Sequence, residues 1–244
     1  MKLPRIYVPL NDVTSDRILF PPGAARYFRD VLRLKAGDNV EVFDGGTKHL
    51  VRLTRCEKRE VAGEIISSRE EVARPEPEIT LAFGCVRPGP FQEILRHGTE
   101  LGVSRFIPLI TRRTTRRTEA TKARWNTVVA SAAAQSGRSR IPAVEEPVSL
   151  ARFLERDWET DLKLVLSVHA AAQPLLTVLS SGVSRVVLLV GPEGGLELSE
   201  EKEAEAAGFS PIGIGGGVLR TETAALASVA VIVNWYDVSR DDRG

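Results

Sequence analysis

From residue 79 onward, short apolar runs rich in β-branched residues alternate with longer segments whose apolar residues recur every three or four positions. This alternation constrains the fold most, because it is typical of an α/β domain with a parallel sheet. The apolar runs predict strands over residues 79–85, 106–110, 162–168, 185–190 and 211–214. The helical periods predict helices over residues 91–101, 122–136, 199–207 and 223–235.

The helix predicted over 199–207 has a clear start. Ser199 can accept a hydrogen bond from a free backbone N–H, and the acidic first turn that follows it complements the helix dipole. Lys202 stands where a glutamate or glutamine would complete a capping box. The sequence therefore predicts a Ser199 cap without that box.

The first 70 residues have a different pattern. Short alternating runs over 39–43, 48–56 and 61–66, with the turn sequence Asp44-Gly45-Gly46 between the first two, predict a small β-rich module, and one helix is expected over 24–34. Residues 73–78, ARPEPE, read as a stiff extended linker. We therefore expect two domains, residues 1–73 and 74–244.

Charge is distributed unevenly along the chain. The formal net charge is +1, but residues 1–140 hold 25 basic and 16 acidic side chains, whereas residues 141–244 hold 8 and 16. Such asymmetry is a reason to expect a polyanionic partner on the basic side, although two ordinary solvated faces would give the same counts.

Several protein classes are disfavoured by composition. Cys56 and Cys85 are the two cysteines, and without a CxxC or a nearby histidine pair they indicate neither a disulfide framework nor a metal site. The N-terminal segment has Pro4 and Arg5 where a signal peptide needs an apolar run, and no stretch is apolar enough to span a membrane. The expectation is a soluble cytoplasmic protein.

Three loops follow three of the predicted strands, and ligands of open α/β sheets bind at the carboxyl ends of strands. They cover residues 167–170, the sequence GPEGG at 191–195, and residues 213–220. Neither a GxGxxG fingerprint nor a P-loop GxxxxGK is present, and Glu193 would repel a phosphate, which disfavours a nucleotide-dependent enzyme. These loops favour a neutral or cationic ligand, while each glycine could instead simply end a strand.

Five spaced motifs together resemble one family. They are VLRLKAGDNVEVFDG at 31–45, ELGV at 100–103, AAAQSGRSRIP at 132–142, GPEGG at 191–195 and VLRTETA at 218–224. In this order they resemble the RsmE family of ribosomal RNA uracil-N3 methyltransferases, of the SPOUT class. The resemblance implies a PUA-like β-barrel followed by a trefoil-knotted α/β domain, an S-adenosylmethionine cofactor, a homodimer, and a uridine of 16S ribosomal RNA or the small subunit as substrate.

The resemblance also implies site residues. Leu219 would pack on adenine, and the apolar face of Ala224, Ala227, Val231 and Trp235 would help to form the dimer. The implied cofactor contacts are Leu166, His169, Gly191, Pro192, Glu193, Gly194, Gly195, Ile214, Gly215, Val218, Leu219, Arg220, Thr221 and Ala224.

The proposed chemistry requires loss of the uracil N3 proton. Arg138 and Arg220 are candidates to stabilise the negative charge that develops on the base, and Glu222 is a candidate to accept the proton. For RNA binding, arginine suits phosphate recognition because its planar fork forms paired hydrogen bonds. The candidates are Arg26, Arg29, Arg33, Arg112, Arg113, Arg116 and Arg117.

Three positions depart from the family pattern. Ala134 stands where the family usually has a glutamate, and His97 where a lysine is common. Gly217 stands in place of the first arginine of the family motif LGxRILR. These departures leave an alternative open, in which the chain is a non-catalytic RNA-binding protein with a degenerate cofactor pocket.

Overall fold

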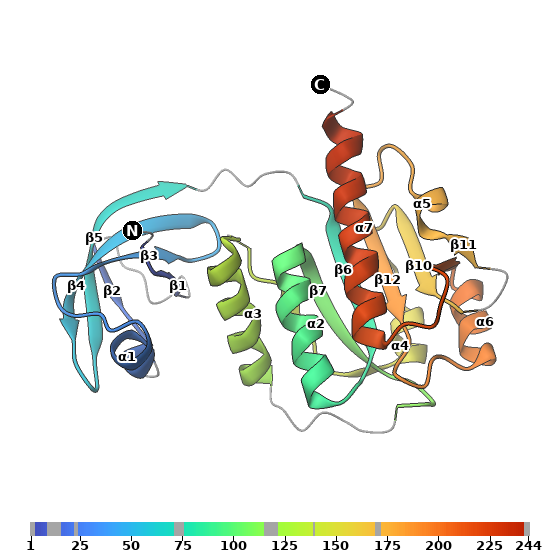
Figure 1. Cartoon of the computed structure of the whole chain (residues 1–244), viewed down its shortest axis with the longest axis horizontal. Coiled ribbons are helices and arrows are strands. Elements are labelled where there is room, and N and C mark those ends of the chain that lie inside the picture. The colour runs from blue at the N-terminus through green and yellow to red at the C-terminus, as the bar shows by residue number, and fades with distance from the viewer. Residues whose placement is uncertain are drawn as a thin grey trace. The chain divides into compact units, whose positions relative to one another are not determined.

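A computed structural model describes residues 3–8, 16–21, 24–70, 76–114, 122–138, 140–168 and 172–241. The chain separates into two compact units (Figure 1), one formed by residues 1–74 with 133–141 and the other by residues 75–132 with 142–244. The assignment of 133–141 to the first unit has no counterpart in the sequence pattern.

The first unit is built on a β-sheet. Within the described ranges it has five strands in the order β1-β3-β4-β5-β2. Their bounds are β1 Arg5–Tyr7, β2 Arg17–Leu19, β3 Asn39–Phe43, β4 Thr47–Cys56 and β5 Val61–Glu70. β1 pairs with β3 in parallel and the other pairings are antiparallel. The predicted β-rich module is confirmed, and β3 has the predicted bounds.

The helix expected over 24–34 is shorter than predicted. One α-helical turn, α1 (Ala24–Arg26), continues into a π-helical segment, η2 (Tyr27–Val31), and Arg33 then adopts a positive φ of 55°. Phe28 anchors the segment, because its fully buried ring packs edge-on against Phe20 with the centroids 4.7 Å apart. The helical segment therefore ends at Val31, two residues before the left-handed backbone of Arg33.

The second unit confirms the predicted parallel sheet. In the part of the chain that the structure describes, eight strands pair in parallel, in the order β11-β13-β10-β12-β6-β7-β8, with β9 also on β7. The five predicted strands are β6 Glu78–Gly84, β7 Val103–Ile110, β10 Leu162–Leu166, β12 Arg185–Val190 and β13 Ser210–Gly213. Three two-residue strands were not predicted: β8 Ala143–Val144, β9 Val148–Ser149 and β11 Gln173–Pro174.

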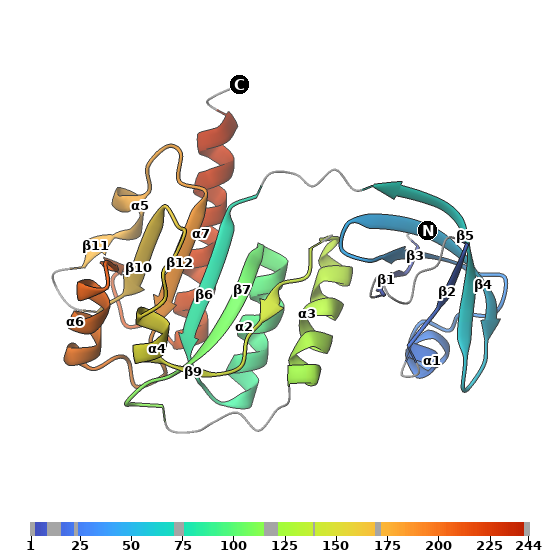
Figure 2. The same ribbon diagram turned by 180° about the vertical axis from the view of Figure 1, so that it is seen from behind.

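Helices cover both faces of this sheet. Their bounds are α2 Pro88–Leu101, α3 Lys122–Ser136, α4 Leu150–Leu154, α5 Leu175–Val178, α6 Leu198–Ala206 and α7 Thr221–Asp241. α2 and α7 lie side by side on one face (Figure 1), and α4 lies on the opposite face (Figure 2). Alternate residues of β6 serve the two faces: the Phe83 ring lies 5.2 Å from that of Phe91 in α2, whereas Ala82 belongs to the core around Phe153 of α4.

The start of α6 differs from the prediction. Glu197, not Ser199, is the N-cap, and it forms a capping box with Glu200, whose carboxylate accepts a 2.9 Å hydrogen bond from the Glu197 N–H. The prediction of a Ser199 cap was wrong because glutamate is an unusual N-cap and the true box begins two residues earlier.

Over the described ranges, no helix is long and apolar enough to cross a membrane. The trefoil knot that the family resemblance implies stays a prediction.

Candidate functional site

The loops after β10, β12 and β13 border one cavity of about 710 Å³. These strands run parallel, and β10 pairs with both of the others, so their carboxyl ends meet at one edge of the sheet. The cavity lies within the size range of pockets for small organic ligands. Its location is the one that the three loops predict.

The predicted cofactor contacts largely meet in this cavity. Those that line it are Leu166, Gly191, Pro192, Glu193, Gly194, Gly195, Ile214, Gly215, Val218, Leu219, Thr221 and Ala224. Arg220 lines a neighbouring cavity instead. His169 lies outside the described residues.

The GPEGG loop folds tightly over the end of the sheet. The Gly195 N–H donates to the Pro192 carbonyl at 2.8 Å, and Gly195 has a φ of 71°, which side chains disfavour. A Cβ on Gly191 would come within 2.9 Å of the Leu196 nitrogen, so only glycine fits there without a backbone shift. All five residues of this loop line the cavity.

The cavity carries charges of both signs. Glu201 is 6% exposed, and its carboxylate accepts a 2.9 Å hydrogen bond from the hydroxyl of Ser167, at the end of β10. Glu193 is held by Arg87, whose Nε lies 3.1 Å from Glu193 Oε1. Arg113 adds a guanidinium to the lining. Glu201 and Arg113 were not predicted as pocket residues, because neither belongs to a strand-end glycine loop.

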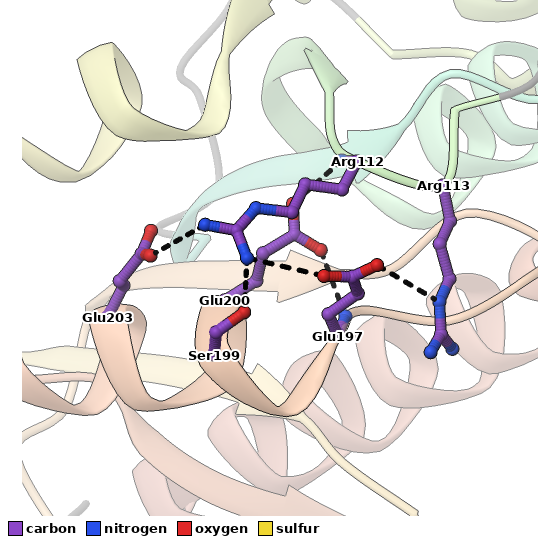
Figure 3. A network of polar contacts seen from close by, with 6 residues as sticks. All are labelled: Arg112, Arg113, Glu197, Ser199, Glu200 and Glu203. Carbon is purple, nitrogen blue, oxygen red and sulfur yellow. Dashed lines mark hydrogen bonds and ion pairs between the residues drawn. The ribbon is translucent and has the colours of Figure 1, made fainter.

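Arg112 and Arg113 connect the loop after β7 to the start of α6 (Figure 3). The Arg112 backbone N–H donates to the Glu200 carboxylate at 2.8 Å, and Nη1 of the Arg112 side chain lies 3.2 Å from Glu197 Oε2. Further partners of the Arg112 guanidinium are the Ser199 hydroxyl and, at 3.4 Å, Glu203.

Arg113 faces the cavity from the same loop. Its Nη1 donates to the Gly194 carbonyl at 2.9 Å, and its Nε lies 3.9 Å from Glu197 Oε1. Both arginines, expected to contact RNA, thus have partners within the chain. Arg116 and Arg117 lie outside the described residues.

A second cavity of about 380 Å³ adjoins the first. Glu193, Val218 and Leu219 line both cavities. The remaining lining residues are Arg87, Pro90, Arg220 and Glu222. Two of the three predicted catalytic residues, Arg220 and Glu222, therefore meet in this cavity. Arg87 lies there as well, although no sequence pattern singled it out.

The other predicted residues lie in the first unit. Arg138 follows α3, and its backbone N–H donates to the Ala133 carbonyl at 3.0 Å. Arg26, Arg29 and Arg33 all have exposed side chains on or next to α1 and η2. We call these three exposed arginines the basic stripe of this unit.

Two family departures have clear surroundings. A Cβ at Gly217 would have nothing within 4 Å, so this position has room for a side chain. His97 is an exposed residue whose Nδ1 lies 3.0 Å from Glu100. Of these two residues, Gly217 lines the first cavity described above and His97 lines neither of the two.

Comparisons with known proteins agree with this geometry. Residues 74–233 match the RNA methyltransferase domain family, and residues 20–66 match the RNA methyltransferase PUA domain family. The ribosomal RNA small subunit methyltransferase E of Synechocystis is 32% identical over 93% of this chain and 76% of its own length. That of Bacillus subtilis is 28% identical over 88% of each chain.

Solved structures give the same answer. Ribosomal RNA small subunit methyltransferase E from Neisseria gonorrhoeae, bound to S-adenosyl methionine, is 33% identical with a TM-score of 0.85, covering 96% of this chain and 98% of its own. A Legionella pneumophila protein in complex with the same cofactor is 30% identical with a TM-score of 0.87, covering 95% and 97%. Together with the cavity at the ends of β10, β12 and β13, these matches show that the chain belongs to the ribosomal RNA small subunit methyltransferase E (RsmE) family.

Proposed function

We propose that this chain uses S-adenosylmethionine to methylate N3 of a uridine in 16S ribosomal RNA. The observation that carries the proposal is the 710 Å³ cavity, lined by the three loops expected to hold the cofactor. Membership of the RsmE family, and the cofactor bound to the Neisseria gonorrhoeae relative, support it. When bound, the cofactor supplies a methyl group on a positively charged sulfonium.

The cavity residues suit this cofactor. Leu166, Val190 and Leu219 offer apolar surface for an adenine ring, and the glycines of the GPEGG loop let backbone groups approach its edge. Glu193 and Glu201 add negative charge to the cavity lining, which would favour a ligand with a sulfonium and an ammonium group. The intact lining disfavours the alternative of a degenerate pocket.

The second cavity receives the target base. It shares the wall of Glu193, Val218 and Leu219 with the cofactor cavity, so a base there borders the methyl donor. The guanidinium groups of Arg87 and Arg220 suit the two carbonyl oxygens that flank N3. A small flat ring fits the volume of about 380 Å³.

The N3 proton must leave before or during transfer, because the lone pair of neutral uracil is tied up in the imide. Arg220 stabilises the negative charge that then develops on the carbonyl oxygens. Glu222, on the first turn of α7, accepts the proton.

The first unit binds the RNA. Its match to the RNA methyltransferase PUA domain family and the exposed Arg26, Arg29 and Arg33 support this role. We expect the partner to be ribosomal RNA or the small subunit, and the protein to act in the cytoplasm.

The chain also acts as a homodimer formed through α7. Ala224, Ala227, Val231 and Trp235 lie on one side of this helix and are only partly buried, whereas Ala225, Val229 and Ile232 face the core. An Ala227→Arg variant should sediment as a monomer in analytical ultracentrifugation, unlike the wild type. A wild-type monomer at micromolar concentration would contradict the dimer.

The reaction is tested by transfer of a labelled methyl group to small subunits and to naked 16S RNA, followed by mass-spectrometric mapping. We expect one N3-methylated uridine, which is also missing from ribosomal RNA of cells that lack this protein. Calorimetry with S-adenosylmethionine separates the alternatives, since a degenerate pocket would bind RNA but no cofactor.

A further inference from the structure

The Arg113 guanidinium lies at the edge of the cofactor cavity. Among the described residues that line this cavity, Arg113 is the only cation, whereas Glu193 and Glu201 are both acidic. Its known contacts use Nη1, on the Gly194 carbonyl, and Nε, 3.9 Å from Glu197. A guanidinium carries five N–H donors, so these two contacts leave it capacity for an anion.

The side chain is held in place before any ligand binds. Its aliphatic carbons pack against Gly194, where an added Cβ would lie 3.4 Å from Arg113 Cβ. The preceding residue, Arg112, ties the same loop to α6 through its backbone hydrogen bond to Glu200, which is 3% exposed. A cation fixed in this way loses little side-chain entropy when it binds a carboxylate.

The expected cofactor carries one anionic group, the carboxylate of its amino-acid end. Glu193 and Glu201 repel that group and suit the sulfonium and the ammonium instead. We propose that Arg113 binds the carboxylate of the cofactor's amino-acid end, an inference that rests on the proposed function. It assigns Arg113 to the cofactor rather than to an RNA phosphate, which the sequence alone favoured.

Measuring the binding of two related ligands distinguishes a contact with the carboxylate from a purely structural role of Arg113. S-adenosylhomocysteine has the amino-acid end, whereas 5′-methylthioadenosine keeps the adenosine and lacks that end. Calorimetry on the full chain should show that Arg113→Met lowers the affinity for S-adenosylhomocysteine about 10- to 100-fold. This is the effect of losing one charge-assisted hydrogen bond. Binding of 5′-methylthioadenosine should change less than about two-fold, and Arg113→Lys should restore part of the lost affinity.

Arg112→Met is the matched control, because Arg112 belongs to the same loop and contacts α6 without lining the cavity. Any loosening of the loop in this variant should affect both ligands equally. If Arg113→Met lowered the affinity for both ligands equally, or for neither, the inference would be overturned while the proposed function stayed intact. A wild-type protein that binds neither ligand would overturn both.

The alternative role for Arg113 is contact with an RNA phosphate, which RNA-binding measurements can test. Filter binding of 16S RNA to Arg113→Met should match the wild type. A large loss of RNA affinity with unchanged S-adenosylhomocysteine binding would return Arg113 to the RNA surface and refute its assignment to the cofactor.

Discussion

Nε of Arg87 lies 3.1 Å from the carboxylate of Glu193, joining the residue before α2 to the GPEGG loop. The Arg87 side chain is 73% exposed, so this ion pair contributes little to stability, at most about 1 kcal/mol. Both residues line the cavity assigned to the target base. We therefore expect the pair to matter more for the reaction than for the fold.

Replacing Arg87 should accordingly impair catalysis selectively. For Arg87→Ala we expect kcat to fall about 10-fold, the equivalent of one hydrogen bond in the transition state, with an unchanged melting temperature and cofactor affinity. Arg96→Ala, an exposed position on α2, is the control in the methyl-transfer assay. An unchanged kcat in Arg87→Ala would remove Arg87 from the base site.

Arg220 should matter more, because it is proposed to stabilise the charge on the base directly. Removal of one preorganised donor of this kind costs about 100- to 1,000-fold in kcat. Arg220→Ala should lose methyl transfer on that scale in single-turnover measurements and still bind S-adenosylmethionine in calorimetry. If it transferred methyl groups at the wild-type rate, the proposed mechanism would fail.

Glu200 should be a stability residue. Its carboxylate, 3% exposed, accepts backbone hydrogen bonds from Arg112 at 2.8 Å and Glu197 at 2.9 Å. Glu200→Ala leaves two N–H groups without this acceptor, and we expect a loss of about 1–3 kcal/mol in urea denaturation. The exposed Glu205→Ala on the same helix should stay within about 0.5 kcal/mol of the wild type.

Asp161 should make the stability of the fold depend on pH in the acidic range. Hydrogen bonds from the backbone N–H groups of Ser184 and Arg185 lower its pKa from 3.8 to about 2. Because the folded-state pKa is the lower one, the stabilisation is complete above about pH 5 and is lost as the pH falls toward 2. The melting temperature of Asp161→Asn should therefore lie below that of the wild type at pH 7, with the difference narrowing below pH 4.

At the exposed Asp157, the same substitution should cause a smaller change at every pH. A pH-independent difference between Asp161→Asn and the wild type would contradict the proposed role of the carboxylate.

The basic stripe of the first unit predicts salt-sensitive RNA binding. The logarithm of the affinity should fall linearly with the logarithm of the salt concentration, and Arg26→Ala with Arg29→Ala should reduce the slope by about 1–2. A double variant of the second unit, Arg152→Ala with Lys202→Ala, removes the same charge from exposed positions on α4 and α6. Equal slopes for the two double variants would exclude the stripe as the RNA contact.

Much of the fold follows from local pattern. β12 and α3 have their predicted bounds, because a continuous apolar run and a long helical period each have few alternatives. The π-helical segment at Tyr27–Val31 could not be predicted, since it depends on how Phe28 packs on Phe20. The two-residue strands are too short to leave a pattern.

The cofactor loops could be predicted because glycine-rich segments after strands meet at one sheet edge. Arg113 could not, because its partner Gly194 is 81 residues away in sequence and nothing in a basic run distinguishes one arginine from the next. Glu193 belongs to a predicted loop, but its partner Arg87 could not be predicted for the same reason, because the two residues are 106 positions apart in sequence.

Glu193, Val218 and Leu219 form a common partition between two compartments. Ligands in two cavities that share a wall can be coupled. If the cofactor changes the affinity for RNA, then RNA must change the affinity for the cofactor by the same factor. After transfer the cofactor lacks one methyl group and its positive charge, so we expect the RNA product to bind with a different affinity from the RNA substrate. These three side chains would then set how strongly the affinities for cofactor and for RNA depend on each other.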